Sequence, residues 1–290
     1  MPNNVQSTIS ESLAGRRCAR VAAIVERRYL SHAQPHGMIG GLRAMGHSVV
    51  VIDPEERVLD TTDSSWTRDI DVAVARGRSW GVLCLLESLE RHAVPVINPR
   101  AAIAAVHNKA EMTVRLASAG IPIPRTWIGS PRQIARQLLP EDFPVIVKPI
   151  FGDNCRGLEL VHDREHLDAL GWTEPTAIVQ RFIPGLEFDL KLYSIGQEVW
   201  AVRKPSPLLA KCFPQAAGLS PEFVPLTESW RKLALRCGTV FGLELYGVDC
   251  IETENGPLVI EVNEFPNYSA VPGADEKLAK FVLASMRQEK

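Results

Sequence analysis

Residues 247–269, GVDCIETENGPLVIEVNEFPNYS, carry the pattern that decides the fold. Two largely apolar runs, 247–253 and 257–263, flank the turn Glu254–Asn255–Gly256, an arrangement typical of a β-hairpin. A few acidic and amide side chains interrupt these apolar runs, and such groups are costly to bury unless they find a partner. The stretch therefore predicts two paired strands that carry a polar site.

The polar site of this hairpin consists of Asp249, Glu261 and Asn263. Glu261 and Asn263 are two residues apart, so they point to the same face of their strand, and Asp249 lies within cross-strand reach. Two carboxylates and one amide oxygen form a hard, all-oxygen ligand set that suits Mg²⁺ bridging nucleotide phosphates. We therefore predict a metal site here. The alternative is a surface hairpin with ordinary acidic residues.

A lysine and a glycine-bracketed loop occur further upstream. Lys148 stands in FPVIVKPI (143–150), an otherwise almost entirely apolar strand, so it must either snorkel or face an anion. The following loop, FGDNCRG (151–157), contains Arg156 and two glycines that let backbone amides turn towards phosphate oxygens. The pattern matches neither a Walker A loop nor GxGxxG. It favours a phosphate-binding strand and loop, with a solvated hairpin turn as the alternative.

The segment VQRFI (179–183) ends a strand that leaves one lobe and enters another. The backbone of such a segment can pair with the edge of an adenine, and Gln180 can reach the exocyclic amine. Downstream, Glu187 and Lys191 fall on one strand face together with Asp189. We expect this face to contact the nucleotide. The alternative is the exposed face of an alternating strand.

Arg203 and Lys204 lie near the end of a further strand, VWAVRKPSP (199–207), just before a proline-rich loop. A positive charge there can face a transferred phosphoryl group or an acidic substrate, whereas the alternative is a solvated strand end. No Ser/His/Asp or Cys/His arrangement with compelling spacing occurs in the chain. We therefore expect chemistry that needs no protein nucleophile.

The N-terminal part of the chain alternates apolar strands with helical patterns. Near-continuous apolar runs predict buried strands at 18–26, 47–54, 69–76 and 94–99, with helices around 35–45 and 80–92. Such alternation with short connections predicts an α/β fold with a doubly wound parallel sheet. A helix over about 103–119 follows this sheet and carries Lys109.

Four segments follow from these patterns: a flexible tail (1–16), an N-terminal α/β domain (17–105), a central lobe (106–183) and a C-terminal lobe with the metal site (184–290). In the central lobe we predict strands at 143–150, 158–161 and 176–183 and a helix at 163–170. In the C-terminal lobe we predict strands near 187–194, 198–203, 246–253 and 257–263 and helices near 227–241 and from about 273.

Bulk composition narrows the class of protein. Of the 290 residues, 46% are hydrophobic and 23% are charged with mixed sign, which indicates a globular protein. A net charge of −2 provides no global field for nucleic acid. The six cysteines lack metal-ligand spacing and favour reduced thiols in the cytosol. No signal peptide or membrane-spanning run occurs, so we expect a cytoplasmic protein without a membrane partner, and a homo-oligomer is left open.

In this order, the motifs resemble the ATP-grasp superfamily over about residues 20–285. Similarity to the RimK-type and glutathione-synthetase-type ligases rests on LLESLERHAVPVINP, Lys109 before AGIPIPRT, VKP with the loop ending Arg156–Gly157, Asp189–Leu190–Lys191, and GVD…EVN. Lys191 departs from the arginine that many RimK-type ligases carry. Similarity to the inositol 1,3,4-trisphosphate 5/6-kinases rests on HNKAEM (107–112), VQRF…KLYSIG (179–196), VRKPS (202–206) and NEFPNYSAVPG (263–273). The loop GDNCRG departs from those kinases because it lacks their serine–histidine pair.

The resemblance implies an ATP-grasp fold with an N-terminal doubly wound domain, and it implies a role for each matching residue. ATP phosphates would contact Lys109, Lys148 and Arg156, and adenine would contact Gln180 and the backbone of Arg181, Phe182 and Ile183. Glu187 would hold the ribose, and Asp249, Glu261 and Asn263 would hold Mg²⁺, with Mn²⁺ as the alternative. Lys191 and Arg203 would face the γ-phosphate and the acceptor as catalytic residues.

The activity implied by the resemblance is a carboxylate–amine ligase that uses ATP and passes through an acyl-phosphate, acting on small-molecule carboxylates and amines. A kinase for an inositol-phosphate-like polyol and a nucleotide-binding module without turnover are the alternatives. The stretch 26–35, with Arg27, Arg28 and His32, is a candidate acceptor loop from the N-terminal domain, or else an exposed polar loop.

Overall fold

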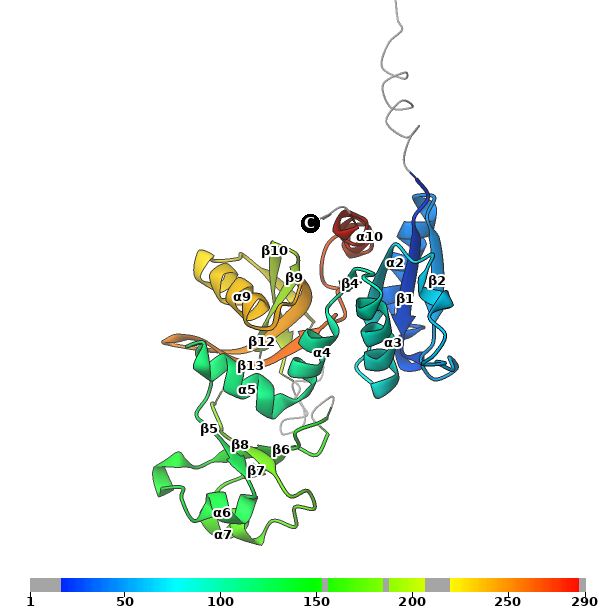
Figure 1. Cartoon of the computed structure of the whole chain (residues 1–290). Helices are drawn as coiled ribbons and strands as arrows, with labels where there is room; N and C mark the ends of the chain where they lie inside the picture. Colours follow the sequence, from blue (N-terminus) through cyan, green and yellow to red (C-terminus); the bar gives the residue numbers. More distant parts are fainter. Residues whose placement is uncertain (1–16, 153–155, 185–187, 207–219, 287–290) are drawn as a thin grey trace, which may run out of the picture.

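The computed structural model describes residues 17–152, 156–184, 188–206 and 220–286, and the strands of these residues form three sheets. The two outer parts of the molecule in Figure 1 are the sheet at the N-terminal end, in blue and cyan, and a green lobe around β5–β8. A third sheet, built largely from the yellow and orange segments, lies beside the first. None of the described helices is long and apolar enough to cross a membrane.

The N-terminal sheet, sheet A, is parallel throughout. Its order is β2 (Ser48–Ile52), β1 (Arg20–Val25), β3 (Val72–Arg76) and β4 (Val96–Ile97). Helices α2 (Ala33–Ala44) and α3 (Trp80–Arg91) cover opposite faces, because Val21 of β1 shares a core with Met38 of α2, whereas Ile24 shares one with Leu86 of α3. This arrangement confirms the predicted doubly wound sheet.

One predicted helix is in fact two. The sequence predicts a continuous helix over about 103–119, but the chain forms α4 (Arg100–His107) and α5 (Lys109–Ser118). Asn108 between them has an extended backbone, and its side-chain oxygen accepts hydrogen bonds from the N–H groups of Ala110 and Glu111. Asparagine is a preferred N-cap residue, so it begins a new helix here and places Lys109 at the first position of that helix.

The central sheet, sheet B, is antiparallel and has a core of its own. Its order is β5 (Thr126–Gly129), β8 (Ala177–Arg181), β6 (Val145–Lys148) and β7 (Glu159–Val161). Helices α6 (Pro131–Ala135) and α7 (Arg164–Ala169) pack on each other and bury Ile134 and Leu167 against this sheet. Lys148 and Arg181 therefore stand at the ends of neighbouring, oppositely directed strands.

The third sheet, sheet C, contains the predicted hairpin. Its antiparallel order is β11 (Glu222–Val224), β10 (Glu198–Pro205), β9 (Phe188–Ile195), β12 (Leu245–Thr253) and β13 (Gly256–Glu264). Helix α9 (Glu228–Phe241) packs on one face. Strands β12 and β13 pair from Thr253 opposite Gly256 up to Tyr246 opposite Glu264, with one bulge after Asp249. The register confirms the hairpin predicted from the sequence.

The last helix, α10 (Ala274–Ser285), packs against α2 at the other end of the chain (Figure 1). Leu278 and Val282 of α10 share one buried cluster with sheet A and with Tyr193 of sheet C. The Gln34 amide donates a 2.9 Å hydrogen bond to Asp275. Sheets A and C are therefore joined by a common core, and the predicted domain boundaries stay a prediction.

Three short helices of the 3-10 type complete the described elements: η1 (Arg27–Tyr29), η2 (Ser65–Thr67) and η3 (Pro140–Asp142). The first of them follows β1 directly. It brings the basic residues of the predicted acceptor loop to the carboxyl edge of sheet A.

Candidate functional site

The hairpin brings its three polar residues together on one face of sheet C. Asp249 lies opposite Glu261 in the register, and Asn263 lies opposite Gly247, two positions along. The Asn263 amide nitrogen donates a 2.6 Å hydrogen bond to the Asp249 carboxylate. A side chain at Gly247 would press on Lys191 and Pro266, so this glycine leaves the space that Lys191 needs. The three residues therefore form one polar cluster.

Lys191 approaches this cluster from the neighbouring strand β9. It lies opposite Asp249 in the register, and its Nζ is 2.7 Å from an Asp249 carboxylate oxygen. Burial disfavours the ammonium charge, but the charge of Asp249, its hydrogen bond with Lys191 and the smaller effects of Tyr193 and Glu261 together outweigh burial and raise the pKa of Lys191. Lys191 is therefore a charged group held against a carboxylate.

Lys109 approaches from helix α5, on the other side of the hairpin. Its Nζ forms an ion pair with Glu261. Burial alone would raise the pKa of Glu261, but the positive charges of Lys109 and of Lys148 lower it below its ordinary value. The charge of Lys148 on sheet B therefore acts on a carboxylate of sheet C. The structure thus brings Lys109, Lys148, Lys191 and the hairpin carboxylates to one region.

Gln180 fixes the position of Lys148 on sheet B. The Lys148 Nζ donates a 3.1 Å hydrogen bond to the Gln180 side-chain oxygen, and the Gln180 amide nitrogen donates at 2.9 Å to the Thr126 hydroxyl. Both ends of this buried amide are thus engaged by protein groups. Its direct effect in this structure is to orient Lys148.

The strand end beyond Gln180 is only partly available to a ligand. The N–H of Arg181 donates to the Arg125 carbonyl and that of Phe182 donates to the Pro144 carbonyl. Backbone hydrogen bonds of this kind do not involve the N–H of Ile183 within the described residues. Among the N–H groups of Arg181, Phe182 and Ile183, that of Ile183 is therefore the one without such a bond to the described residues. Glu187, predicted to hold a ribose, lies outside the described residues.

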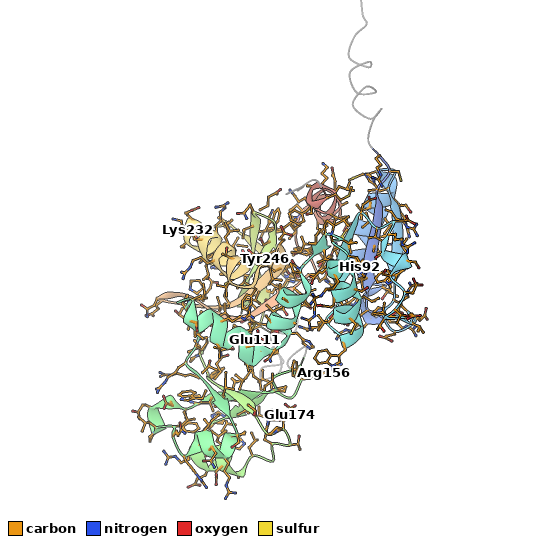
Figure 2. All side chains as sticks on the ribbon, viewed as in Figure 1. His92, Glu111, Arg156, Glu174, Lys232 and Tyr246 are labelled. Atoms are coloured by element: carbon orange, nitrogen blue, oxygen red, sulfur yellow. The ribbon has the colours of Figure 1, made fainter. Side chains whose placement is uncertain are left out.

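Arg156 is exposed on the loop that follows β6. Figure 2 labels it on the side of the green lobe that faces α4 and α5. The start of the same loop touches α4, because the rings of Phe151 and His107 pack edge to face with centroids 5.0 Å apart. Arg156 therefore lies on the side of sheet B that faces α4 and α5, and among the described residues no contact joins it to the cluster.

Arg203 is not brought to the cluster, and its sequence-based placement beside Lys191 needs correction. Side chains alternate along β10, and Arg203 lies opposite Leu190, on the face of sheet C that packs against α9. There it makes two hydrogen bonds to Glu252, of 2.7 and 3.0 Å. Arg203 and Lys191 therefore occupy opposite faces of the sheet.

The next residue, Lys204, occupies the position that was expected for Arg203. It lies on the same face as Lys191, and its Nζ is 5.1 Å from the centroid of the Tyr193 ring. Burial and the neighbouring charge of Lys191 lower the pKa of Lys204. The period-two alternation of strands would have selected Lys204, had the register of β9 with β10 been known.

Asp189 adds a third carboxylate near this face. It lies opposite Lys204 in the register. Burial raises the pKa of Asp189 to about 6, the Asp249 charge adds to this effect, and a hydrogen bond from Ser206 together with the Lys191 charge opposes it. The cluster is therefore a densely charged surface in which lysines and carboxylates alternate.

The two carboxylates of the cluster need further oxygen ligands to hold a hard cation. Within the described ranges, no three His, Cys, Asp or Glu side chains gather at metal-binding distance. Asp249 and Glu261 supply two carboxylates, and a half turn of the Asn263 amide would present its oxygen beside them. These are the hard oxygen donors that Mg²⁺ prefers, and phosphate oxygens commonly complete such a set.

Comparison with known proteins identifies the fold family. The RimK-like ATP-grasp domain matches residues 106–278, more than half of the chain. The α-aminoadipate–LysW ligase LysX of Saccharolobus solfataricus is 26% identical over 267 residues, covering 83% of this chain and 92% of that protein. The tetrahydromethanopterin:α-L-glutamate ligase of Methanocaldococcus jannaschii is 27% identical over 249 residues, covering 75% of this chain and 81% of that protein.

A solved structure agrees with this assignment. The RimK domain ATP-grasp protein of Sphaerobacter thermophilus superposes with a TM-score of 0.74 at 23% identity, covering 91% of this chain and 100% of that one. A likeness of this degree shows the fold, and it confirms the fold class predicted from the sequence. The shared architecture agrees with the domain match, and the domain match shows that the chain belongs to the RimK-like ATP-grasp family.

Proposed function

We propose that the protein is an ATP-dependent ligase that joins a carboxylate to an amine and forms ADP and phosphate. The observation that carries this proposal is the convergence of lysines from α5, β6 and β9 on the carboxylates of one hairpin. Convergent cations suit a nucleotide polyphosphate, and the facing carboxylates suit the metal ion that accompanies it.

The lysines and carboxylates of the site neutralise one another. Lys109 pairs with Glu261, and Lys191 pairs with Asp249. On binding of the metal–nucleotide complex, the lysines would exchange carboxylate oxygens for phosphate oxygens, while the carboxylates would exchange ammonium groups for the metal ion. Neither partner is then left as an unpaired buried charge, which would be strongly unfavourable.

Within the nucleotide site we assign the β- and γ-phosphates to Lys109 and Lys148, with Arg156 at the rim. Adenine would lie along the strand end at Phe182–Ile183, where the Ile183 N–H would donate to it. In this scheme the Gln180 side chain positions Lys148, and the backbone of the strand end contacts the adenine.

Asp249, Glu261 and the Asn263 oxygen would hold Mg²⁺, with Mn²⁺ as the alternative. When bound, the ion neutralises charge on the phosphates and aligns them for transfer. Lys191 and Lys204 line the same face, so we assign them, and not Arg203, to the charge that develops on the transferred phosphoryl group.

The reaction needs no protein nucleophile. A substrate carboxylate oxygen attacks the γ-phosphorus, the bond to the β-phosphate oxygen breaks, and ADP leaves. The substrate amine then attacks the carbonyl carbon of the acyl-phosphate, inorganic phosphate departs, and the amine loses a proton as the amide forms. The protein contributes positioning and charge neutralisation, which are the main sources of catalysis in phosphoryl transfer.

Ligation is favoured over phosphorylation of a polyol. The relatives compared above are named as ligases, and two of those names contain α-aminoadipate and α-L-glutamate. An acidic amino acid is therefore the first substrate class to test. The cytosolic location and the oligomeric state inferred from the sequence stay predictions.

The first test of this proposal replaces Glu261. We expect Glu261→Gln to reduce Mg-dependent ADP release by about a hundredfold or more, since it removes a charge that faces both Lys109 and the metal. Turnover should require a carboxylate and an amine together, whereas a kinase would need a single hydroxyl acceptor. ADP release is measured with pairs of candidate acids and amines.

The matched control is Glu252→Gln, which breaks the pair with Arg203 on the opposite face of the sheet. This control should keep turnover near the wild-type value. Equal activity of Glu261→Gln and wild type would refute the metal assignment. Calorimetric binding of ATP that is independent of Mg²⁺, without ADP release for any substrate pair, would instead indicate a nucleotide-binding module.

A further inference from the structure

The short segment that follows β6 connects the central sheet to the helices α4 and α5. Sheet B has a buried core of its own, formed among its strands and the helices α6 and α7. Residues 150–151, which begin two positions after the end of β6, contact the start of α5 and the end of α4 (Figure 1). Lys148 is the last residue of β6, and Lys109 is the first residue of α5. The contact therefore lies between the two lysines that we assign to the phosphates.

Two interactions make up this contact. The backbone N–H of Lys109 donates a hydrogen bond to the Ile150 carbonyl, with the nitrogen and oxygen 3.1 Å apart. The ring of Phe151 packs against the ring of His107, with centroids 5.0 Å apart and an angle of 67° between the ring planes. Aromatic rings prefer such an edge-to-face orientation, so the pair constrains direction as well as distance. Together the two interactions hold the segment after β6 in place against the start of α5.

Phe151 does not owe its position to a buried core. Its side chain is 50% exposed, and it belongs to none of the buried clusters formed by the described residues. The stabilisation gained by burying an aromatic ring is therefore only partly realised at this position. The contact with His107 explains the placement of this ring better than core packing does.

His107 suits the contact because its ring carries no charge. Burial, followed by the positive charges of Arg78 and Lys109, lowers the pKa of His107 to about 4. The imidazole therefore stays neutral near pH 7 and packs against Phe151 as an uncharged ring. It also adds no further positive charge beside Lys109.

The chain between Phe151 and Lys148 is stiff. It contains Pro149, whose ring fixes its own backbone angle φ. The segment also folds back on this proline, because a Cβ at Gly152 would lie 3.1 Å from the Pro149 Cγ and one at Gly157 would lie 3.6 Å from it. A displacement of Phe151 would therefore be transmitted to Lys148 and would not be absorbed by the intervening backbone.

The chain between His107 and Lys109 is held as firmly. Asn108 caps α5, since its side-chain oxygen accepts two N–H groups of the first turn at 3.1 Å each. The Lys109 carbonyl accepts a 2.7 Å hydrogen bond from the Thr113 hydroxyl one turn later. The position of Lys109 therefore follows the position of His107.

The spacing of the two lysines matters for a polyphosphate. Burial raises the pKa of Glu261 and the charges of both lysines lower it, so both amines act on the same carboxylate. Two cations bind two phosphate groups of one nucleotide well only if the distance between the amines matches the distance between the phosphates. An error in this spacing would reduce affinity for the β- and γ-phosphates, but it would not affect adenine at the end of β8.

We propose that His107 and Phe151 are positioning residues that set the spacing between Lys109 and Lys148, and through it the affinity of the protein for the β- and γ-phosphates of ATP. This inference rests on the proposed ligase function. It adds to that function two uncharged rings that act through the lysines on either side of the contact.

The test compares a ligand that carries the β- and γ-phosphates with one that lacks them. Binding of a non-hydrolysable ATP analogue with Mg²⁺, and of AMP, to the full chain is measured by calorimetry. We expect Phe151→Ala and His107→Ala each to weaken binding of the analogue about three- to tenfold, the size of one aromatic contact, and to leave AMP affinity unchanged. The double variant should bind the analogue no more weakly than either single variant, because both changes remove the same contact.

Conservative variants separate the ring contact from other effects of these positions. Phe151→Tyr and His107→Phe keep an aromatic ring on both sides of the contact, so they should restore most of the affinity that the alanine variants lose. All variants should unfold at temperatures close to that of the wild type, because Phe151 is half exposed and completes no core.

The chain offers matched controls for both positions. Phe223 of β11 is exposed to nearly the same degree, 51%, and the exposed His92 directly follows α3 in the N-terminal part (Figure 2). Phe223→Ala and His92→Ala should leave binding of the analogue unchanged. The inference is overturned if Phe151→Ala binds the analogue as tightly as the wild type, or if the alanine variants weaken AMP and the analogue equally. If the wild type itself binds no ATP analogue, the proposed function fails, so the two failures are distinguishable.

Discussion

At the scale of single residues, the site consists of charges that the chain itself pairs. Lys109 and Glu261 are far apart in the sequence but form one ion pair, and Lys191 forms another with Asp249. Residue types and spacing selected Asp249, Glu261 and the strand face of Lys191 as candidates, whereas Lys109 was selected through the family resemblance. Their pairing depends on how α5 and β9 pack beside the hairpin, and this long-range packing is not encoded in any local pattern.

The confusion of Arg203 with Lys204 has a simple physical origin. In a strand, a shift of one residue transfers a side chain to the opposite face. The sequence located the basic pair at the end of β10, but the choice between its two members requires the register with β9. Likewise, Arg28 and Arg78 come together only because Glu26 binds both segments, and the sequence contains no sign of that contact.

Glu26 permits a test at this scale. Burial opposes its charge, but hydrogen bonds from the Ser79 and Arg78 N–H groups and from Arg28 outweigh burial and lower the pKa of Glu26 in the folded protein. A carboxyl whose folded-state pKa is lowered stabilises the fold above its unfolded pKa of about 4.5, and this contribution is lost as pH falls through the folded value.

Replacement of Glu26 by Gln should therefore lower the free energy of unfolding by about 1–3 kcal/mol near neutral pH. The difference from wild type should shrink as the pH is lowered below about 4.5. Urea unfolding at several pH values measures both effects, with the exposed Glu174→Gln as a control that changes little. A difference that stays constant with pH would contradict the assigned role of the Glu26 charge.

At the scale of elements, most predicted helices and strands occur in the structure, and the elements that were missed are short. The strands of sheet A, the hairpin and helices α3, α9 and α10 agree with their patterns. Strand β5, helix α6 and strand β11 were missed, since three to five residues are too few to display a period. The break between α4 and α5 was missed because apolar residues continue on both sides of Asn108.

The break at Asn108 has a functional consequence that can be measured. Asn108→Ala should cost about 1 kcal/mol of stability, because two N–H groups of the first turn of α5 lose their acceptor. The same change should weaken binding of the ATP analogue, since it loosens the turn that positions Lys109.

Asn108→Asp should preserve both properties, because aspartate caps helices equally well. Urea unfolding and calorimetric titration measure the two effects. If Asn108→Ala lowers stability but leaves nucleotide affinity unchanged, the position of Lys109 does not depend on this cap.

At the scale of the whole molecule, sheets A and C act as one body through their shared core, whereas sheet B has its own. Glycines on α2 allow α10 to approach closely. A Cβ at Gly37 would lie 2.0 Å from the Asp275 carboxyl carbon, and one at Gly41 would lie 3.3 Å from the Ala279 Cβ. The two helices therefore pack this closely because glycine has no side chain at these two positions.

Gly37→Ala should lower the free energy of unfolding by about 1–2 kcal/mol, because Asp275 must move and give up its hydrogen bond to Gln34. Gly40→Ala, in the same helix, is the matched control. No atom lies within 4 Å of a Cβ at Gly40, so alanine should stabilise the helix by up to about 1 kcal/mol. Thermal unfolding of the two variants should shift in opposite directions. A shift of both in the same direction would argue against the tight helix contact.

The docking of α10 on α2 also bears on how the polypeptide acquires its shape during synthesis. Domains tend to fold as units while the chain is being translated, beginning from the N-terminal side. Here Met38 and Leu42 of α2 share a buried cluster with Leu278 and Val282 of α10, which the ribosome adds much later. The apolar surface of the nascent N-terminal part therefore stays exposed to solvent until translation reaches the last helix. A chaperone that covers this surface would protect the chain from aggregation during that interval.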